Sequence, residues 1–262
     1  MPNTNNNVTA GLRHLLLAAA IVACALPGAS AVAGPLDWLG GEQIKGSGTI
    51  KKQSRELTHF TGVSLNLPGS MELRIGTSEN VTLEGDDNIL PLIETVIEGG
   101  VLKIRPIKRN MNLQMRNLKI VVNAKEVERL SLGGSGSIDA DALRGKKLTI
   151  DVGGSGSINV KGMEAETIAV SVGGSGNFKS GGGATDSLSV SIGGSGDVDV
   201  GQVRSRDASV SVAGSGEAIV WASNDLSVTV AGSGDVNYYG DPRVSRSVVG
   251  SGSTRRLGAA PR

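Results

Sequence analysis

The 262-residue sequence has very few large or chemically reactive side chains. It contains one cysteine, two histidines and two each of Phe, Trp and Tyr. A chain with so few large apolar groups cannot fill a wide hydrophobic core, so its core must be narrow. The chain carries 26 basic and 25 acidic residues, a balance that gives no electrostatic footprint for nucleic acid. Glycine is abundant instead, with 39 residues.

The single cysteine lies in an N-terminal segment with the features of a secretory leader. Residues 15–26, LLLAAAIVACAL, form a short apolar run after a segment with one arginine and one histidine. The stretch GASAVAG then offers A-x-A cleavage sites after Ala31 and Ala33. The apolar run is shorter than the roughly 20 residues that a membrane span needs. We therefore predict a signal peptide over residues 1–33, a linker over 34–45, and export to the periplasm or the cell exterior.

Cys24 leaves one alternative open. The residues IVAC that end at Cys24 resemble a bacterial lipobox, and lipidation there would make the protein an outer-membrane lipoprotein. We favour loss of Cys24 with the leader, because Leu26 prolongs the apolar run and the A-x-A sites follow it. The exported chain would then have no disulfide, no thiolate metal site and no thiol nucleophile. Membrane attachment is expected only if Cys24 is lipidated.

Gly-Ser-Gly triplets recur through the second half of the chain. They begin at seven positions spaced by 20 and then 18 residues, with an outlying copy at Gly46: Gly134, Gly154, Gly174, Gly194, Gly214, Gly232 and Gly250. Between triplets, apolar residues alternate with small polar ones, as at Leu188, Val190 and Ile192. Period-two alternation indicates half-buried strands, and repeats of this length are typical of solenoids. Each repeat therefore predicts two strands joined by a glycine corner.

We predict an all-β fold, a single-chain parallel β-solenoid similar to a right-handed β-helix. Its coils would stack about 4.8 Å apart. One internal ladder would then contain the apolar residues that follow the triplets, interrupted by the smaller Ala218: Ile138, Ile158, Phe178, Val198 and Val236. Glycine suits the corners because it accepts positive φ and has no Cβ to collide with the next coil. The alternative is an antiparallel β array in which each triplet turns a hairpin.

The exported part divides into two sections and a tail. Residues 46–126 show the same alternation with less regular corners, so we predict an irregular N-terminal β lobe continuous with the repeat. Residues 127–253 form the GSG-repeat solenoid, and residues 254–262 form a tail.

The order of the motifs resembles a known family. A Phe60-x-x-Val63 strand, VTLEGDDN at residues 81–88 and GGVLKI at residues 99–104 precede the GSG repeats. This order is similar to the auto-transporter adhesin head GIN domain family, over roughly residues 50–253. The resemblance implies an exported bacterial protein of the cell envelope with a solenoid-like β fold. The general function of that family is not established, and it supplies no catalytic motif to carry onto this sequence.

The sequence offers no firm catalytic constellation. His59 is the only histidine after the leader, and we expect it on the surface rather than in a Ser-His-Asp triad. The carboxylate pairs Asp139/Asp141 and Asp197/Asp199 flank strands, where charged residues keep the outer face solvated. We therefore predict a non-enzymatic envelope or surface scaffold with adhesin-like binding of a glycan or protein. The alternative is a polysaccharide-active enzyme, which a cleft lined by three or more convergent charged side chains would favour.

Two groups of residues are candidates for ligand binding. Alternation places Trp221 and Tyr239 outside the core on adjacent coils, where an aromatic pair could hold a sugar ring or an apolar group of a partner. We favour a cap over this pair, formed by the terminal segment VSRSVVG, because solenoid ends must be covered. The basic stretch that contains Lys108 and Arg109 could contact an anionic glycan or a lipid head group. A solvated loop is the simpler interpretation of that stretch.

The position just after the triplet carries an acid in three successive repeats, at Asp197, Glu217 and Asp235. If these residues stack in register their charges repel one another, and a bound calcium ion could relieve the repulsion because it takes six to eight oxygen ligands. Solvated carboxylates with fanned side chains are the simpler interpretation. We therefore predict no cofactor, with calcium as the alternative. The sequence determines neither the ligand nor the oligomeric state.

Overall fold

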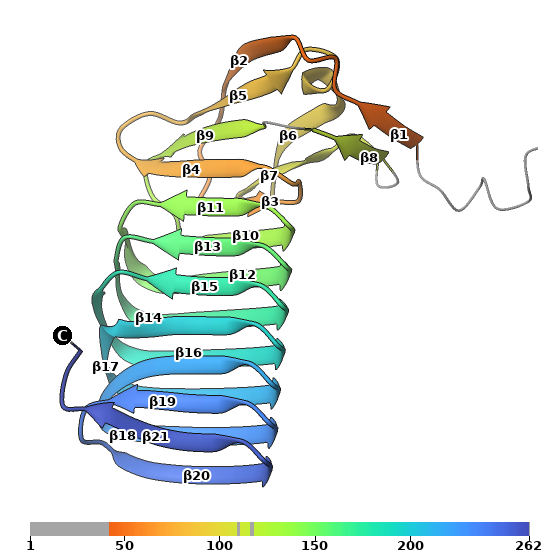
Figure 1. Cartoon of the computed structure of the whole chain (residues 1–262). Coiled ribbons are helices and arrows are strands. Elements are labelled where there is room, and N and C mark those ends of the chain that lie inside the picture. Colours follow the sequence, from red (N-terminus) through yellow and green to blue (C-terminus); the bar gives the residue numbers. More distant parts are fainter. Residues whose placement is uncertain (1–41, 109–110, 116–117, 262) are drawn as a thin grey trace, which may run out of the picture. The chain divides into compact units, whose positions relative to one another are not determined.

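The computed structural model describes residues 42–108, 111–115 and 118–261. In this part the chain is all-β, and its coils stack as a parallel β-solenoid of about six turns (Figure 1). The predicted signal peptide over residues 1–33 and Cys24 within it lie outside the described residues, as does most of the predicted linker. Among the described residues, no helix has the length and apolar character needed to span a bilayer.

Each coil of the repeat contains two strands joined by a GSG corner. The strands that precede the corners form the pre-triplet sheet: β10 (Arg129–Gly134), β12 (Leu143–Gly154), β14 (Met163–Gly174), β16 (Gly183–Gly194) and β20 (Arg243–Gly250). The strands that follow the corners form the post-triplet sheet: β11 (Ser137–Ala140), β13 (Ser157–Val160), β15 (Asn177–Ser180), β19 (Asp235–Tyr239) and β21 (Ser253–Gly258). Two longer strands begin in the post-triplet sheet and end in the pre-triplet sheet: β17 (Asp197–Gly214) and β18 (Glu217–Gly232). Strand β21 includes most of the segment that we predicted as a tail.

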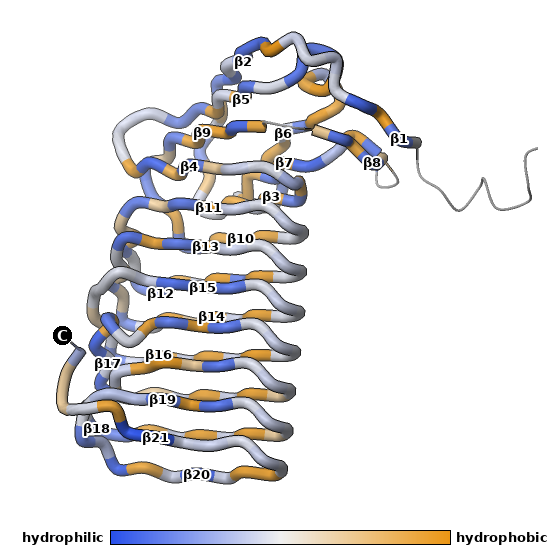
Figure 2. Tube along the Cα trace, viewed as in Figure 1, coloured by the Kyte–Doolittle hydropathy of each residue, from blue (hydrophilic) through white to orange (hydrophobic). Residues whose placement is uncertain are grey.

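All repeat strands pair in parallel, so the solenoid is confirmed and the antiparallel array is wrong. Strand β12 pairs with β14 with Leu148 beside Ile168, and β14 pairs with β16 with Ile168 beside Leu188. Hydrophobic and hydrophilic residues alternate along these strands, as Figure 2 shows. The alternation sends one set of side chains inward and the other outward, because successive side chains of a strand point to opposite faces.

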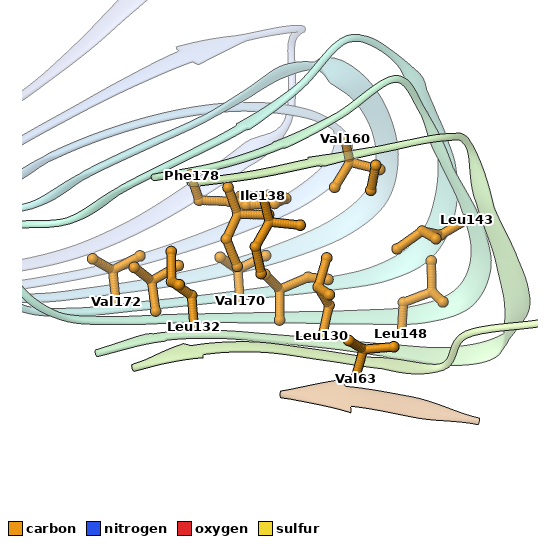
Figure 3. Packing of buried hydrophobic residues seen from close by; sticks show 14 of the residues in the cluster. Val63, Leu130, Leu132, Ile138, Leu143, Leu148, Val160, Val170, Val172 and Phe178 are labelled. Carbon is orange, nitrogen blue, oxygen red and sulfur yellow. The ribbon is translucent and has the colours of Figure 1, made fainter. Parts of the chain in front are cut away.

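The predicted internal ladder is confirmed. Ile138, Ile158, Phe178, Val198, Ala218 and Val236 occupy matching positions on successive coils and are at most 1% exposed. In Figure 3, Ile138 and Phe178 face Leu132 and Val170 across the core. Only one layer of side chains from each sheet fills this space. Medium-sized aliphatic residues are therefore sufficient, which explains how a chain with few aromatics forms a closed core.

In its described residues, the N-terminal lobe has nine strands and one short 3₁₀ turn: β1 (Glu42–Lys45), β2 (Ile50–Glu56), β3 (Gly62–Leu65), β4 (Ser70–Ile75), β5 (Asn80–Asp86), η1 (Leu90–Leu92), β6 (Ile93–Glu98), β7 (Val101–Pro106), β8 (Met111–Gln114) and β9 (Lys119–Ala124). The lobe is continuous with the repeat, but its coils are out of chain order. Strand β3 lies between β7 and β10, and β4 lies between β9 and β11. The first coil of the chain is therefore enclosed between a later coil and the repeat.

Antiparallel strands close the N-terminal end of the stack. Strand β5 runs antiparallel to β9 and β2, and β6 runs antiparallel to β7. The outlying triplet is not a corner, because it lies against the turn after β5. Gly48 N donates to Asp86 Oδ1 (2.7 Å), and Ser47 Oγ donates to Asp87 Oδ1 (2.6 Å). A Cβ at Gly46 would lie 2.2 Å from Asp86 Oδ2, so a side chain there would displace the Asp86 carboxylate.

The corners depend on very close approach between successive triplets. The first glycine of each triplet has positive φ, for example +122° at Gly194. A Cβ there would lie 2.4 Å from the carbonyl oxygen of Gly174 on the preceding coil. The amide of Ser195 donates a 2.8 Å hydrogen bond to the same oxygen. The preceding residue Gly193 has no atom within 4 Å of its Cβ position.

We predict that Gly194→Ala lowers the free energy of unfolding by at least about 2 kcal/mol, because it combines a strained φ with a backbone overlap. The matched change Gly193→Ala should alter it by less than about 0.5 kcal/mol, since Ala213 already occupies the equivalent position one coil later. Guanidinium unfolding of both variants measures the difference. Equal losses in the two variants would contradict this account of the corner.

Candidate functional site

The outer surface of the post-triplet sheet is hollowed near its N-terminal end. A depression of about 460 Å³ lies over β4, β11, β13 and β15. Its floor is the backbone of these strands, whose inward side chains, such as Met71 and Val160, are buried in the core. Its polar lining comes from outward side chains, including Glu72, Asp139 and Asn159. The site is therefore built mainly on paired strands, with Asp141, Lys161 and Gly181 directly after the strands end.

The solenoid register brings the polar side chains of the depression into one row. Glu72 lies beside Asp139, Asp139 beside Asn159, and Asn159 beside Lys179. The sequence alone predicts Asp139 and Asp141 only as solvated residues that flank a strand. The spacing of 20 residues from Asp139 through Asn159 to Lys179 was a signal that could have located most of this row. Glu72 falls outside that period and joins the row only through the pairing of β4 with β11.

Every carboxylate in the depression has a partner. Arg74 Nε lies 2.8 Å from Glu72 Oε1, and Asn159 Nδ2 donates to Asp139 Oδ1 (3.0 Å). Asp141 accepts from Lys161 Nζ (2.8 Å) and from the amide of Ile75 (3.2 Å). The hydrogen bond from Arg74 lowers the pKa of Glu72, and that from Lys161 lowers the pKa of Asp141. These two groups stay ionised at neutral pH.

The partners of these carboxylates help to decide whether the depression is the active site of an enzyme. More than three charged side chains line the depression, as that alternative requires: Glu72, Lys119, Asp139, Asp141, Lys161 and Lys179. A carboxyl that acts as a general acid, however, needs a raised pKa near the working pH. The pKa values of Glu72 and Asp141 are lowered instead. This arrangement suits binding of a polar ligand better than proton transfer to it.

A second depression of about 410 Å³ adjoins the first at Ser70. Hydroxyl groups line it, from Ser135 and Ser155 at the corners and from Ser137 and Ser157 on β11 and β13. Ser70, Ser137 and Ser157 stand in register on three successive strands. Together the two depressions present hydroxyl, amide and charged groups at the regular spacing of the strands.

The structure places the predicted aromatic pair in register and packs it against the surface. Trp221 lies beside Tyr239 on the adjacent coil, and both side chains are half-buried. The guanidinium carbon of Arg204 is 5.9 Å from the centroid of the Trp221 ring, within cation–π range. The Tyr239 ring lies over Gly201, where a Cβ would be 3.4 Å from its Cε2 atom. The pair therefore has a structural role that leaves part of each ring accessible.

The predicted cap over this pair is wrong. The segment VSRSVVG belongs to β20, which pairs with the second half of β18 in the pre-triplet sheet. It adds one more rung to the stack because its alternation continues that of β18, with Val244 beside Leu226. All eight residues of β20 are exposed.

The basic stretch is partly neutralised within the N-terminal lobe. Lys103 Nζ lies 2.6 Å from Glu98 Oε2, and Arg105 is paired with both Glu94 and Glu98 across the β6–β7 hairpin. Lys108 follows β7 and is exposed, whereas Arg109 lies outside the described residues. An anion site at Lys108 and Arg109 stays a prediction.

The three acids after the triplets stack in register, but each accepts a hydrogen bond from the next coil. Asp197 Oδ1 accepts from the amide of Glu217 (3.1 Å), and Glu217 Oε1 accepts from Asn237 Nδ2. Asp235 Oδ1 accepts from the amide (3.0 Å) and the hydroxyl (2.7 Å) of Ser253. In the part of the chain that the structure describes, no three His, Cys, Asp or Glu side chains are grouped to hold a metal ion. Calcium binding at these acids stays an untested prediction.

His59 is exposed, as expected, and contacts carboxylates. Its Nδ1 atom lies 2.7 Å from Glu79 Oε1, and its Nε2 atom lies 3.7 Å from Glu126 Oε1. Lys125 Nζ also contacts Glu79, at 3.3 Å. This is a surface ion cluster between loops, and its hydrogen bonds contain no nucleophile.

Comparison with known protein families identifies the family of this chain. The family described as "Putative auto-transporter adhesin, head GIN domain" matches residues 59–242. The chain belongs to this head GIN family. No curated protein sequence matches it. Membership supports a surface protein without catalytic activity in general terms, and an exported or surface location, but it names no ligand.

Solved structures from three bacteria share the fold of this head GIN protein. A putative adhesin from Bacteroides fragilis has a TM-score of 0.76 at 21% identity, covering 82% of this chain and 100% of that one. A putative lipid binding protein from Parabacteroides distasonis has a TM-score of 0.69 at 26% identity, with the same coverage of 82% and 100%. A putative adhesin from Parabacteroides merdae has a TM-score of 0.66 at 18% identity, covering 82% and 99%.

We predict that Asp141→Asn destabilises the head GIN protein by up to about 1 kcal/mol at pH 7. The pKa of Asp141 is lowered by its hydrogen bond from Lys161, so its contribution is present above the unfolded-state pKa of about 3.9 and is lost as pH falls below it. Urea unfolding from pH 7 down to pH 3 should show the two proteins converging. The exposed Asp186→Asn serves as the control. A difference that does not change with pH would contradict the assignment.

Proposed function

We propose that this head GIN protein is an exported, non-catalytic surface module that binds a hydroxyl-rich glycan along the outer face of its post-triplet sheet. The observation that carries the proposal is the pair of adjoining depressions over β4, β11, β13 and β15. They combine hydroxyl, amide and paired charged groups on strands that pair in parallel with their neighbours.

The regular spacing of these groups favours a polymer over a small ligand. Ser70, Ser137 and Ser157 repeat at the strand spacing of about 4.8 Å, so each can contact successive hydroxyls of an extended chain. The strands need no ordering when the ligand binds, which lowers the entropic cost of association. Asp139 and Asn159 are already oriented by their mutual hydrogen bond and can turn their remaining donor and acceptor positions outward.

The aromatic pair extends the same face. Trp221 lies where β18 leaves the post-triplet sheet, because it pairs with Tyr239 of β19 on one side and with Arg204, which pairs with β16, on the other. Strand β18 follows β13 by three strand steps, roughly 14 Å. Accessible ring edges at this distance can contact a sugar ring of a chain that already lies in the depression. In this arrangement the depression provides the polar contacts and the pair adds an apolar one.

The charged residues that line the first depression also fit an alternative function, that of a polysaccharide-active enzyme. The lowered pKa values of Glu72 and Asp141 weigh against it, since neither is poised to donate a proton. Incubation with each bound glycan, followed by an assay for new reducing or unsaturated ends, distinguishes the two. We expect no new ends. Turnover that is lost in Glu72→Gln would establish the enzyme instead.

Binding is tested on a glycan and cell-envelope array, with lipid vesicles as a separate arm because a relative at 26% identity is described as lipid binding. Asn159→Trp fills the depression from an exposed position and should lower affinity at least roughly tenfold. The matched control Ser191→Trp, exposed on the pre-triplet sheet, should bind like the wild type. Trp221→Ala/Tyr239→Ala should weaken binding to long glycans more than to short ones.

Three other results of this binding experiment would contradict the proposal. Glycan binding that survives in Asn159→Trp but is lost in the double variant would move the site to the aromatic pair. Binding to vesicles alone would replace the glycan with a lipid. A wild-type protein that binds nothing on the array would leave a structural scaffold.

A further inference from the structure

The two ends of the solenoid differ. Antiparallel strands close the N-terminal end, but the last coil, β20 and β21, pairs only with the coil before it. Six large aliphatic side chains are strongly exposed among the described residues, and four of them lie in this last coil: Val244, Val248, Val249 and Leu257. The hydroxyl of Thr254, at an inward position of β21, is buried without a hydrogen-bond partner. This end has an apolar surface and a free strand edge.

The free edge has a definite side-chain pattern. Val244, Arg246 and Val248 continue the inward row of Leu226, Val228 and Val230 on β18. Within the described chain the Arg246 guanidinium has no hydrogen bond or ion pair, whereas Arg243 on the same strand is paired with Asp225. A strand that completed this edge would therefore need an apolar, an acidic and an apolar residue at alternate positions.

Symmetric pairing of two such ends does not meet this requirement. Antiparallel pairing of β20 with β20 of a second copy, in the register that sets Val244 opposite Val248, would place Arg246 opposite Arg246. Like charges directly opposite each other destabilise a strand pair. The charge of this edge calls for a different segment, with a carboxylate in the middle.

The chain itself contains such a segment just before β1. Residues 34–41, GPLDWLGG, lie outside the described residues and carry Pro35, Asp37 and Leu39 at alternate positions. The pattern is apolar, acidic and apolar, with Asp37 central, so it matches Val244, Arg246 and Val248 in either strand direction. In the predicted exported form this segment lies at the free N-terminus.

The segment cannot reach the last coil of its own molecule. Strand β1 pairs with β8, in the connection between β7 and β9. From β9 to β21 there are eight strand steps, roughly 38 Å. The five residues from Asp37 to Glu42 span at most roughly 18 Å. Only a second copy can supply the strand.

We propose that residues 35–39 of one molecule add as a strand to the free edge of β20 in the next, with Asp37 facing Arg246. Backbone hydrogen bonds along β20 supply affinity, and the alternate side chains set the register. The contact joins different surfaces of the two molecules, so it is head-to-tail and continues into an open chain of copies. It is independent of the glycan site, which lies on the outer face of the sheet.

The test is sedimentation velocity of the exported full chain over a concentration series. The wild type should associate, and both Arg246→Glu and Asp37→Arg should weaken association at least roughly tenfold. Combining the two substitutions should restore it. Arg255→Glu changes the net charge by the same amount at an outward position of the same coil, and it should associate like the wild type.

Three outcomes would overturn the proposal. A wild type that stays monomeric at every concentration would make Arg246 a charge that only protects a free edge from aggregation. Association unchanged in both single variants would place the contact elsewhere. A combined variant that fails to associate, although thermal unfolding shows all variants folded, would refute the Asp37–Arg246 pairing.

Discussion

The fold depends on the contact between the first glycines of successive GSG triplets. The carbonyl oxygen of each such glycine occupies the space that a Cβ would need on the next, 2.6 Å away at Gly154 and 2.2 Å at Gly214. The same oxygen accepts a hydrogen bond from the serine amide of the next triplet, as Gly134 does from Ser155 at 3.0 Å. This contact fixes both the distance between coils and their register. Once the register is fixed, most residues of the repeat lie beside the one 20 or 18 positions away, and the internal ladder follows from the sequence alone. The register shifts within β17 and β18, where Arg204 lies beside Trp221.

The register also determines what the outer face can do. Lys161 lies over Asp141, Asn159 over Asp139 and Arg144 over Glu164, each pair separated by 20 residues. Exposed pairs of this kind contribute little to stability. Their effect is to orient the side chains of each row and to pair its charges. The face therefore offers polar contacts, but the carboxylates of Glu72 and Asp141 are already paired with Arg74 and Lys161. Further along the stack, outward positions hold Ile219, Trp221 and Tyr239 in place of the charged groups, which gives the surface two chemically different sections.

The periodic part of the protein could be predicted from the sequence, and the non-periodic part could not. Alternation and triplet spacing predict the parallel coils, the ladder from Ile138 to Val236 and the placement of Trp221 beside Tyr239. They cannot predict that β3 and β4 lie between later strands, because that pairing joins segments with unlike spacing and no shared motif. The partner of the outlying triplet was hidden for the same reason, since Asp86 is 38 residues from Gly48. The depression shares both features, because its row from Asp139 to Lys179 is periodic and Glu72 is not.

The two ends of the stack show why a parallel solenoid needs non-periodic sequence somewhere. Every added parallel coil presents the same unpaired edge as the coil before it, so repetition alone cannot end the sheet. At the N-terminal end the chain solves this by folding back: β5 and β6 run antiparallel to their neighbours, and Ile89, Leu90 and Ile93 close the core. At the C-terminal end the parallel pairing continues, but the residues at inward positions change. Arg246 and Thr254 occupy the positions that Val228 and Val236 hold one coil earlier. A charged side chain in an inward row stops indiscriminate stacking of apolar edges, and it also sets the charge that any strand completing that edge must carry.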